Sequence, residues 1–146
     1  MSDFERKVSN NPVEYARGVI FSAQNEVLLL ERAGEHSTGL WECPGDVLDL
    51  GESFEMARYR AIYEKTGLEV IRFPSPQPDF VIEYGQRRTE FSLVRVFGGE
   101  LRLNPQENSG YIYADPRTVL DRDLAPDTQA ALKYYAPSFQ QLKPLE

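Results

Sequence analysis

The sequence predicts one α/β domain in which helices pack on a single β-sheet. Three observations support this fold class. The 146 residues, 41% of them hydrophobic, suffice for one compact domain with its own core. Short β-branched and leucine-rich runs stand on both sides of a segment with helical spacing, and a second helical segment comes late in the chain. No internal repeat, low-complexity stretch or linker divides the chain.

The first strands and the first helix follow from local patterns. Strands are expected at 15–22 and 26–31, because both runs are rich in β-branched residues and leucine and are separated by the turn-forming Ala-Gln-Asn. A helix is expected over 53–66, with Ser53 as its N-cap and Gly67 placed to end it. Its positions at helical spacing are Phe54, Ala57, Ala61 and Ile62.

The sheet is expected to resume after this helix. The strands expected at 79–84 and 88–97 should form a hairpin across 85–87. Pro116 suits the start of a short helical turn, and Pro126 suits the start of a final helix that runs to about Ala136. The strands themselves are expected at 68–73, 79–84, 88–97 and 110–115.

The composition excludes several function classes. Sixteen Lys and Arg against 23 Asp and Glu give a net charge of −7, which disfavours a nucleic-acid polymer as partner, because its phosphates require surplus positive charge. No segment approaches the roughly 20 apolar residues that span a bilayer, and the first residues lack the apolar run of a signal peptide. Cys43, the single cysteine, cannot form an intrachain disulfide and is expected to be a small buried hydrophobe. We expect a cytoplasmic protein.

The segment from Trp41 to Ser53 concentrates glycine and acidic residues and leads directly into the predicted helix. Glu52 stands just before that helix, and Arg60 and Glu64 lie one turn apart on it, where they are neighbours. Carboxylates beneath a glycine loop suit a divalent cation and a diphosphate, since hard cations take oxygen ligands and close backbone approach needs glycine. A solvated helix face with an ordinary ion pair explains the same spacing, so both interpretations stay open.

Residues 41–70 resemble the signature of the Nudix family. That signature reads Gly, five residues, Glu, seven residues, then Arg-Glu-apolar-any-Glu-Glu-any-Gly-apolar. In this chain the signature begins at Asp46. Five residues separate Asp46 from Glu52, and seven residues separate Glu52 from the run Arg60 to Leu68, so the spacing is complete.

The likeness extends over roughly residues 14–135. Trp41-Glu-Cys-Pro-Gly45 resembles the family's Trp-x-x-Pro-Gly approach, and the run from Tyr111 to Pro116 resembles its late strand. The resemblance implies an α/β/α sandwich with a mixed sheet, as a single domain over 1–146 with an N-terminal arm and a C-terminal tail outside its core. It also implies hydrolysis of a nucleoside diphosphate linked to another moiety, with Mg²⁺ or Mn²⁺ held by the signature glutamates.

This chain departs from the signature at three positions. Ala61 replaces a glutamate that binds metal or serves as base, Lys65 replaces a metal-binding glutamate, and Asp46 replaces the glycine, although Gly45 remains. Two glutamates would contribute −2, whereas Ala61 and Lys65 contribute 0 and +1, a difference of +3. An ammonium about 4 Å from a dication is repelled by at most roughly 8 kcal/mol at an effective dielectric near 20. The departures therefore disfavour a metal in the usual place.

These departures lead to one main hypothesis and two rivals. In the main hypothesis, metal-dependent hydrolysis is weakened, altered or lost, and the protein binds a nucleotide-like diphosphate small molecule in the cleft between Trp41, the loop at 45–52 and the helix at 54–65. Lys65 could there take the place of the metal and contact the diphosphate directly. In the first rival, it is an active pyrophosphohydrolase with a rearranged carboxylate site and Mg²⁺ or Mn²⁺, which keeps several waters. In the second, the fold is a non-catalytic partner-binding or dimerisation module without a metal.

The candidate residues follow from these hypotheses. If the protein is active, the catalytic candidates are Glu64, Glu52 and Arg60, with Glu107 as a further carboxylate. Glu64 is also the metal candidate, while the resemblance assigns Glu52 and Arg60 chiefly to pairing with each other. The candidates for substrate binding are Arg32, Trp41, Gly45, Asp46 and Lys65.

Several of these residues have an equally ordinary structural explanation. A strand-end arginine such as Arg32 is usually solvated, and Trp41 suits packing under the loop as well as stacking on a base. His36 lies in a polar loop, where it is either an ordinary exposed residue or a substitute general base. The predicted final helix carries three large side chains that supply core contacts or a homodimer surface, namely Leu132, Tyr134 and Tyr135.

Overall fold

The computed structural model describes residues 11–33, 39–75 and 77–139. Within these residues, an eight-stranded sheet carries two α-helices and a short 3-10 helix. The helices are α2 (Phe54–Thr66), η1 (Val119–Asp121) and α3 (Pro126–Phe139). The strands are β1 (Val13–Phe21), β2 (Val27–Arg32), β3 (Trp41–Glu42), β4 (Gly45–Val47), β5 (Leu68–Arg72), β6 (Phe80–Tyr84), β7 (Arg87–Gly99) and β8 (Asn108–Ala114).

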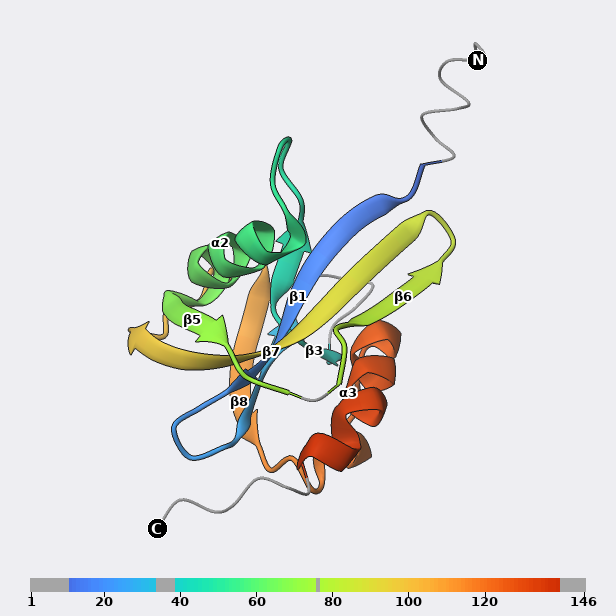
Figure 1. Ribbon diagram of the computed structural model, residues 1–146. Helices are drawn as coiled ribbons and strands as arrows, with labels where there is room; N and C mark the ends of the chain where they lie inside the picture. The colour runs from blue at the N-terminus through green and yellow to red at the C-terminus, as the bar shows by residue number, and fades with distance from the viewer. Residues whose placement is uncertain (1–10, 34–38, 76, 140–146) are drawn as a thin grey trace.

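The parallel pair of β1 and β7 forms the centre of the sheet (Figure 1). The main path runs β3-β2-β1-β7-β5, while β4 pairs with β1, β6 with β7 and β8 with β2. All of these other pairings are antiparallel, so the sheet is mixed. Helix α2 covers one face and α3 the other (Figure 1). The predicted α/β architecture with a mixed sheet is confirmed.

Helix α2 begins and ends where the sequence predicts. The Ser53 hydroxyl accepts a hydrogen bond from the Met56 amide at 3.1 Å, which satisfies one of the open amides of the first turn. At the other end, Gly67 has φ 75° and its amide donates to the Tyr63 carbonyl at 2.8 Å. Its completely buried apolar side chains are those of Ala57, Ala61 and Ile62.

Two apolar clusters fill the space between the sheet and its helices. Successive side chains of a strand point to opposite faces. Accordingly, Val19 and Phe21 of β1 belong to the cluster under α3, which also holds Leu132 and Tyr135. Ile20 belongs to the cluster under α2. The core interpretation of Leu132 and Tyr135 is therefore confirmed.

Two short strands lie in the segment that the sequence analysis treated as a loop. β3 pairs with β2, and β4 pairs with β1. Runs of two and three residues are too short to show the alternation that identifies a strand. They nevertheless tie the signature loop to the central sheet on both sides.

The end of the chain also differs from the prediction. Helix α3 continues past Ala136 to Phe139, with Pro137 in its last turns. The ring of Phe139 packs edge-on against Phe21, with 5.6 Å between the ring centroids, and this buried contact offsets the hydrogen bond that a proline removes. After Pro116 the chain makes a turn, and its short helical segment is η1. No helix of the described residues is long and apolar enough to cross a membrane.

Candidate functional site

Arg60 joins the signature loop to helix α2. Its Nε and Nη2 donate to the two Glu52 carboxylate oxygens at 2.8 and 2.9 Å. Nη2 also donates to the Val47 carbonyl at 3.0 Å, and Nη1 donates to Glu64 at 3.0 Å. Asp49 adds an ion pair at 3.3 Å. The guanidinium therefore binds the start of the helix, the middle of the helix and the loop between β4 and α2.

These contacts favour the ionised form of the Glu52 carboxylate. Hydrogen bonds from Arg60 and from the Asp49 amide hold the pKa of Glu52 below its ordinary value. The predicted pairing of Glu52 with Arg60 and of Arg60 with Glu64 is confirmed. Glu64, the one remaining candidate metal ligand of the signature, is thus already engaged by a cation.

Strand β4 fixes the other side of the loop. Gly45 lies opposite Arg17 on β1, and a Cβ added at Gly45 would stand 2.1 Å from the Ala16 carbonyl oxygen and 2.6 Å from the Arg17 Cα. Only glycine permits this approach. Asp46 follows at once, paired in register with Ala16, so its backbone position is set by the sheet rather than by a free loop.

Asp46 and Lys65, both departures from the family signature, face each other. The Lys65 Nζ lies 3.9 Å from the Asp46 Oδ2. The other carboxylate oxygen of Asp46 accepts a hydrogen bond from the Val47 amide at 2.8 Å, which orients the side chain. The Lys65 side chain is only 19% exposed, whereas that of Asp46 is 40% exposed. A cation and an anion of this chain therefore occupy the region where the family places glutamate and glycine.

The residues present at the signature do not fit a divalent metal. Ala61 has no ligand atom and is completely buried between α2 and the sheet, and Lys65 brings a positive charge. Across the residues that the structure describes, no group of three or more His, Cys, Asp or Glu side chains is arranged to hold a metal ion. A hard cation takes oxygen ligands, and neither Ala61 nor Lys65 supplies one.

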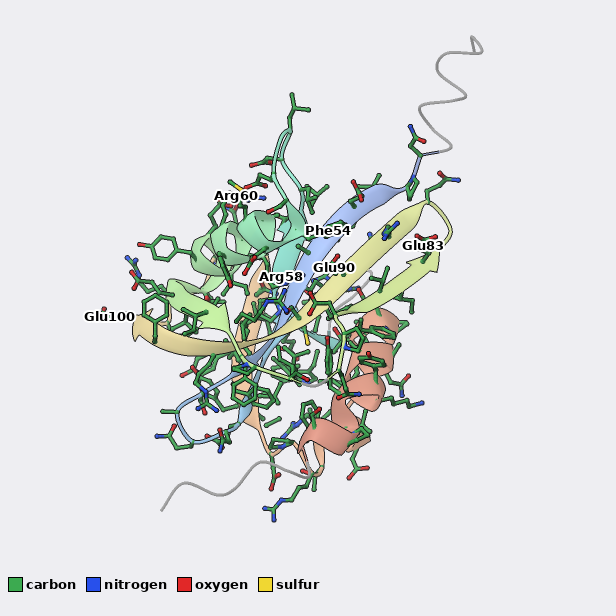
Figure 2. All side chains as sticks on the ribbon, viewed as in Figure 1. Phe54, Arg58, Arg60, Glu83, Glu90 and Glu100 are labelled. Carbon is green, nitrogen blue, oxygen red and sulfur yellow. The ribbon has the colours of Figure 1, made fainter. Side chains whose placement is uncertain are left out.

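A second arginine of α2, which the sequence analysis did not single out, is buried beneath the helix. Arg58 is 1% exposed. Its Nε donates to the Arg17 carbonyl at 2.8 Å, and its Nη2 donates to the Glu90 carboxylate at 3.2 Å. Figure 2 shows Arg58 next to Glu90, with Arg60 on the outer side of the helix. The burial of Arg58 is not evident from the sequence, because an arginine between Ala57 and Tyr59 resembles a surface residue.

A third charged group lies between β1, β3 and the first turn of α3. The Arg17 Nη1 donates to the Cys43 carbonyl at 2.9 Å. The Arg17 Nε lies 3.2 Å from the Asp127 Oδ2, but neither atom has hydrogen-bond alignment, so the attraction between them is ionic. Glu42 pairs with both Arg17 and Arg32. The substrate-binding candidate Arg32 is therefore held by a carboxylate of β3.

Cys43 is buried in the same region. Its side chain is fully buried, and this burial, together with the nearby Asp127 carboxylate, raises the pKa of its thiol to about 12. The predicted role of Cys43 as a small buried side chain is confirmed.

The structure separates the remaining candidates from α2. Trp41 packs against the cluster under α3, rather than under the signature loop as expected, and its backbone hydrogen-bonds with Asp123 and Ala125. Glu107 is exposed just before β8, and its carbonyl accepts from the Ala33 amide. No hydrogen bond or ion pair of the described residues joins Glu107 to α2. His36 lies outside the described residues.

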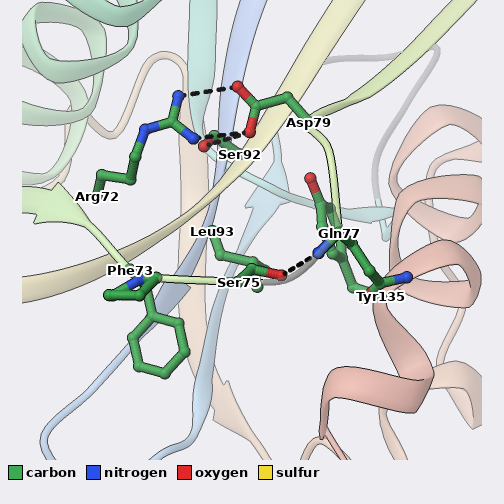
Figure 3. Close-up of a pocket in the computed structure, with 9 residues that line it drawn as sticks. Arg72, Phe73, Ser75, Gln77, Asp79, Ser92, Leu93 and Tyr135 are labelled. Atoms are coloured by element: carbon green, nitrogen blue, oxygen red, sulfur yellow. Dashed lines mark hydrogen bonds and ion pairs between the residues drawn. The ribbon is translucent and has the colours of Figure 1, made fainter.

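A hollow of about 200 Å³ opens at the edge of β7, between the end of β5 and the start of β6 (Figure 3). There Asp79 receives two hydrogen bonds from Arg72 and one from Ser92. These bonds outweigh the effect of burial and hold the pKa of Asp79 below its ordinary value. The Tyr135 hydroxyl bridges the strands by accepting from the Phe80 amide and donating to the Phe91 carbonyl. The polar groups named here satisfy one another.

Comparison with known proteins identifies the family. Residues 13–135 match the NUDIX domain. The chain belongs to the Nudix family. A 50-residue stretch is 44% identical to RNA pyrophosphohydrolase from Photorhabdus laumondii; it covers 34% of this chain and 27% of that protein.

Solved structures show the same Nudix fold. The Escherichia coli ORF135 protein superposes with a TM-score of 0.71 at 22% identity, covering 95% of this chain and 98% of its own. An Ap4A hydrolase from Caenorhabditis elegans superposes with a TM-score of 0.71 at 15% identity, covering 88% of this chain and 99% of its own. At these identities the likeness shows the fold, and the chemistry of this Nudix protein depends on its own residues.

Proposed function

We propose that this Nudix protein binds a nucleoside-diphosphate-linked small molecule through Lys65 without a divalent metal, and that metal-dependent hydrolysis is weakened or lost. The observation that carries the proposal is the Lys65 ammonium, which stands at a metal-ligand position of the signature. Ala61 and the engaged Glu64 leave no carboxylate set that favours a divalent ion there.

The surroundings of Lys65 suit an oxyanion. Within the described residues its ammonium pairs with Asp46 alone, at 3.9 Å, which is beyond hydrogen-bond distance. The ammonium therefore has donors that the protein leaves for solvent or a ligand. Because the side chain is mostly buried, its attraction to a phosphate is less screened than that of a surface lysine.

The loop around Lys65 is already held in shape. Arg60 fixes Glu52 and the Val47 carbonyl, and the close pairing of Gly45 with β1 fixes the strand before them. A site that is ordered before binding loses less free energy when the ligand arrives. The relatives named Ap4A hydrolase and RNA pyrophosphohydrolase support phosphoanhydrides of nucleotides as the ligand class.

Ligand binding without metal tests the proposal directly. A panel of nucleoside diphosphates and triphosphates, sugar nucleotides and dinucleotides is screened in EDTA for a rise in melting temperature. We expect at least one ligand to stabilise the protein, and Lys65→Ala to weaken its binding about tenfold or more. Lys133→Ala, which removes an exposed lysine of α3, should leave the affinity unchanged.

The same panel with Mg²⁺ and Mn²⁺ distinguishes the rival functions. Rapid metal-dependent release of phosphate products would contradict the proposal and establish a rearranged active site. Failure of every ligand to raise the melting temperature would instead support a partner-binding or dimerisation module.

A further inference from the structure

Lys65 and Asp46 form a pair that a ligand can open. The 3.9 Å separation of Nζ and Oδ2 permits charge attraction without a hydrogen bond. The Arg60 contacts differ in kind, because that guanidinium donates to both oxygens of Glu52 at 2.8 and 2.9 Å. A phosphate that enters this region meets one cation that is firmly held by carboxylates and one that is loosely paired.

Asp46 is held where it must affect any anion that approaches Lys65. Its backbone is paired with β1, and its Oδ1 is held by the Val47 amide. The carboxylate therefore cannot move far from the ammonium without breaking that hydrogen bond. A ligand phosphate at Lys65 must either replace the Asp46 carboxylate as the counter-ion or bind beside a like charge, and both reduce the observed affinity.

We propose that Asp46 is a built-in competitor for the phosphate site: it is the counter-ion of Lys65 in the empty protein, and the diphosphate of the ligand takes over that role when it binds. This inference rests on the proposed function, because it assumes that Lys65 receives the phosphate. Asp46 is then the residue that sets the affinity, and a diphosphate, with its larger charge, displaces it more readily than a singly charged carboxylate ligand does.

The experiment is a calorimetric titration of inorganic pyrophosphate into the 146-residue protein in EDTA. Asp46→Asn keeps an oxygen for the Val47 amide but removes the charge. We expect it to tighten pyrophosphate binding about fivefold, the upper end of the effect of an exposed ion pair. Asp49→Asn is the matched control: it removes the same charge from the same loop, but Asp49 pairs with Arg60. We expect the control to change the affinity less than twofold.

The outcomes separate this inference from the proposed function. If Lys65→Ala binds pyrophosphate as the unmodified protein does, the proposed function fails, and the competitor role fails with it. If Lys65→Ala loses binding while Asp46→Asn and Asp49→Asn have equal affinities, only the competitor role of Asp46 is overturned. Asp46→Ser, which also retains an oxygen near the Val47 amide, provides a second test of the same charge if Asp46→Asn folds poorly.

Discussion

Helix α2 carries two cations that face the signature loop, and they are held very differently. Arg60 is fixed by hydrogen bonds to Glu52, Glu64 and the Val47 carbonyl. Lys65, five residues later, has one loose partner in Asp46. The first arrangement positions the loop on the helix, whereas the second leaves a partly buried charge available for a ligand. Within one helix, Arg60 and Glu64 match the signature, whereas Ala61 and Lys65 stand at positions where the signature has glutamate.

The largest effect is expected where α2 is fixed to the sheet from beneath. Arg58→Ala leaves a cavity and an unpaired Glu90 carboxylate under the helix, and should destabilise the protein by about 3 kcal/mol. Urea unfolding monitored by circular dichroism measures this change. Arg117→Ala, which removes an exposed side chain that pairs with Asp115, should cost less than about 0.5 kcal/mol. Equal costs for the two variants would show that the buried arginine does not anchor α2.

The next largest effect is expected from restoring the metal ligands. Ala61→Glu combined with Lys65→Glu changes the summed charge of these two positions from +1 to −2 and restores both signature carboxylates, one of them at the buried position 61. We expect Mg²⁺ binding to appear, and hydrolysis of a nucleotide diphosphate to increase about tenfold or more. Lys65→Glu alone should give a smaller gain, because Ala61 still lacks a ligand atom. A folded double variant that binds no Mg²⁺ would mean that further parts of the metal site are absent.

A smaller effect is expected from weakening the fixed cation. Arg60→Lys retains the charge but cannot donate to both Glu52 oxygens and to the Val47 carbonyl, so we expect a loss of stability of about 1 kcal/mol. The pKa of Glu52 should rise toward its ordinary value, because the hydrogen bonds from Arg60 are the main reason that this pKa is low. NMR titration of the Glu52 side chain measures this directly. An unchanged pKa would contradict the role of Arg60 in holding the carboxylate.

The smallest effect concerns Cys43, on the opposite side of the sheet from α2. Its pKa is about 12 in the folded protein and near 9 when unfolded. The unfolded thiol therefore releases its proton first, so stability falls as the pH rises above 9. Between pH 8 and 9.5 the loss is about 0.8 kcal/mol. Cys43→Ala should lack this component of the pH dependence in urea unfolding, and identical pH profiles would show that Cys43 is not shielded.

The sequence predicted the elements that carry a strong local signal. Ser53 and Gly67 bound helix α2 as expected, and the spacing of Glu52, Arg60 and Glu64 correctly placed them in one charged cluster. The two-residue β3 and three-residue β4 had no such signal, because their pairing depends on partners distant in the chain.

The site was predictable only in part for the same reason. The departures at Asp46 and Lys65 were visible in the sequence, but their pairing depends on β4 lying against β1. Arg58 and Arg17 are buried because carbonyl and carboxylate oxygens from remote strands receive their hydrogen bonds and charge. Such partners cannot be inferred from local spacing.

The most direct test of the account is a titration of Mn²⁺ into the unmodified protein. Calorimetry and the electron paramagnetic resonance signal of free Mn²⁺ measure the binding. With a cation at position 65 and a methyl group at position 61, we predict no stoichiometric binding at micromolar Mn²⁺. The Ala61→Glu, Lys65→Glu variant serves as the positive control. Tight binding of one Mn²⁺ by the unmodified protein, abolished by Glu64→Gln, would contradict the account and identify the site as a working metal centre.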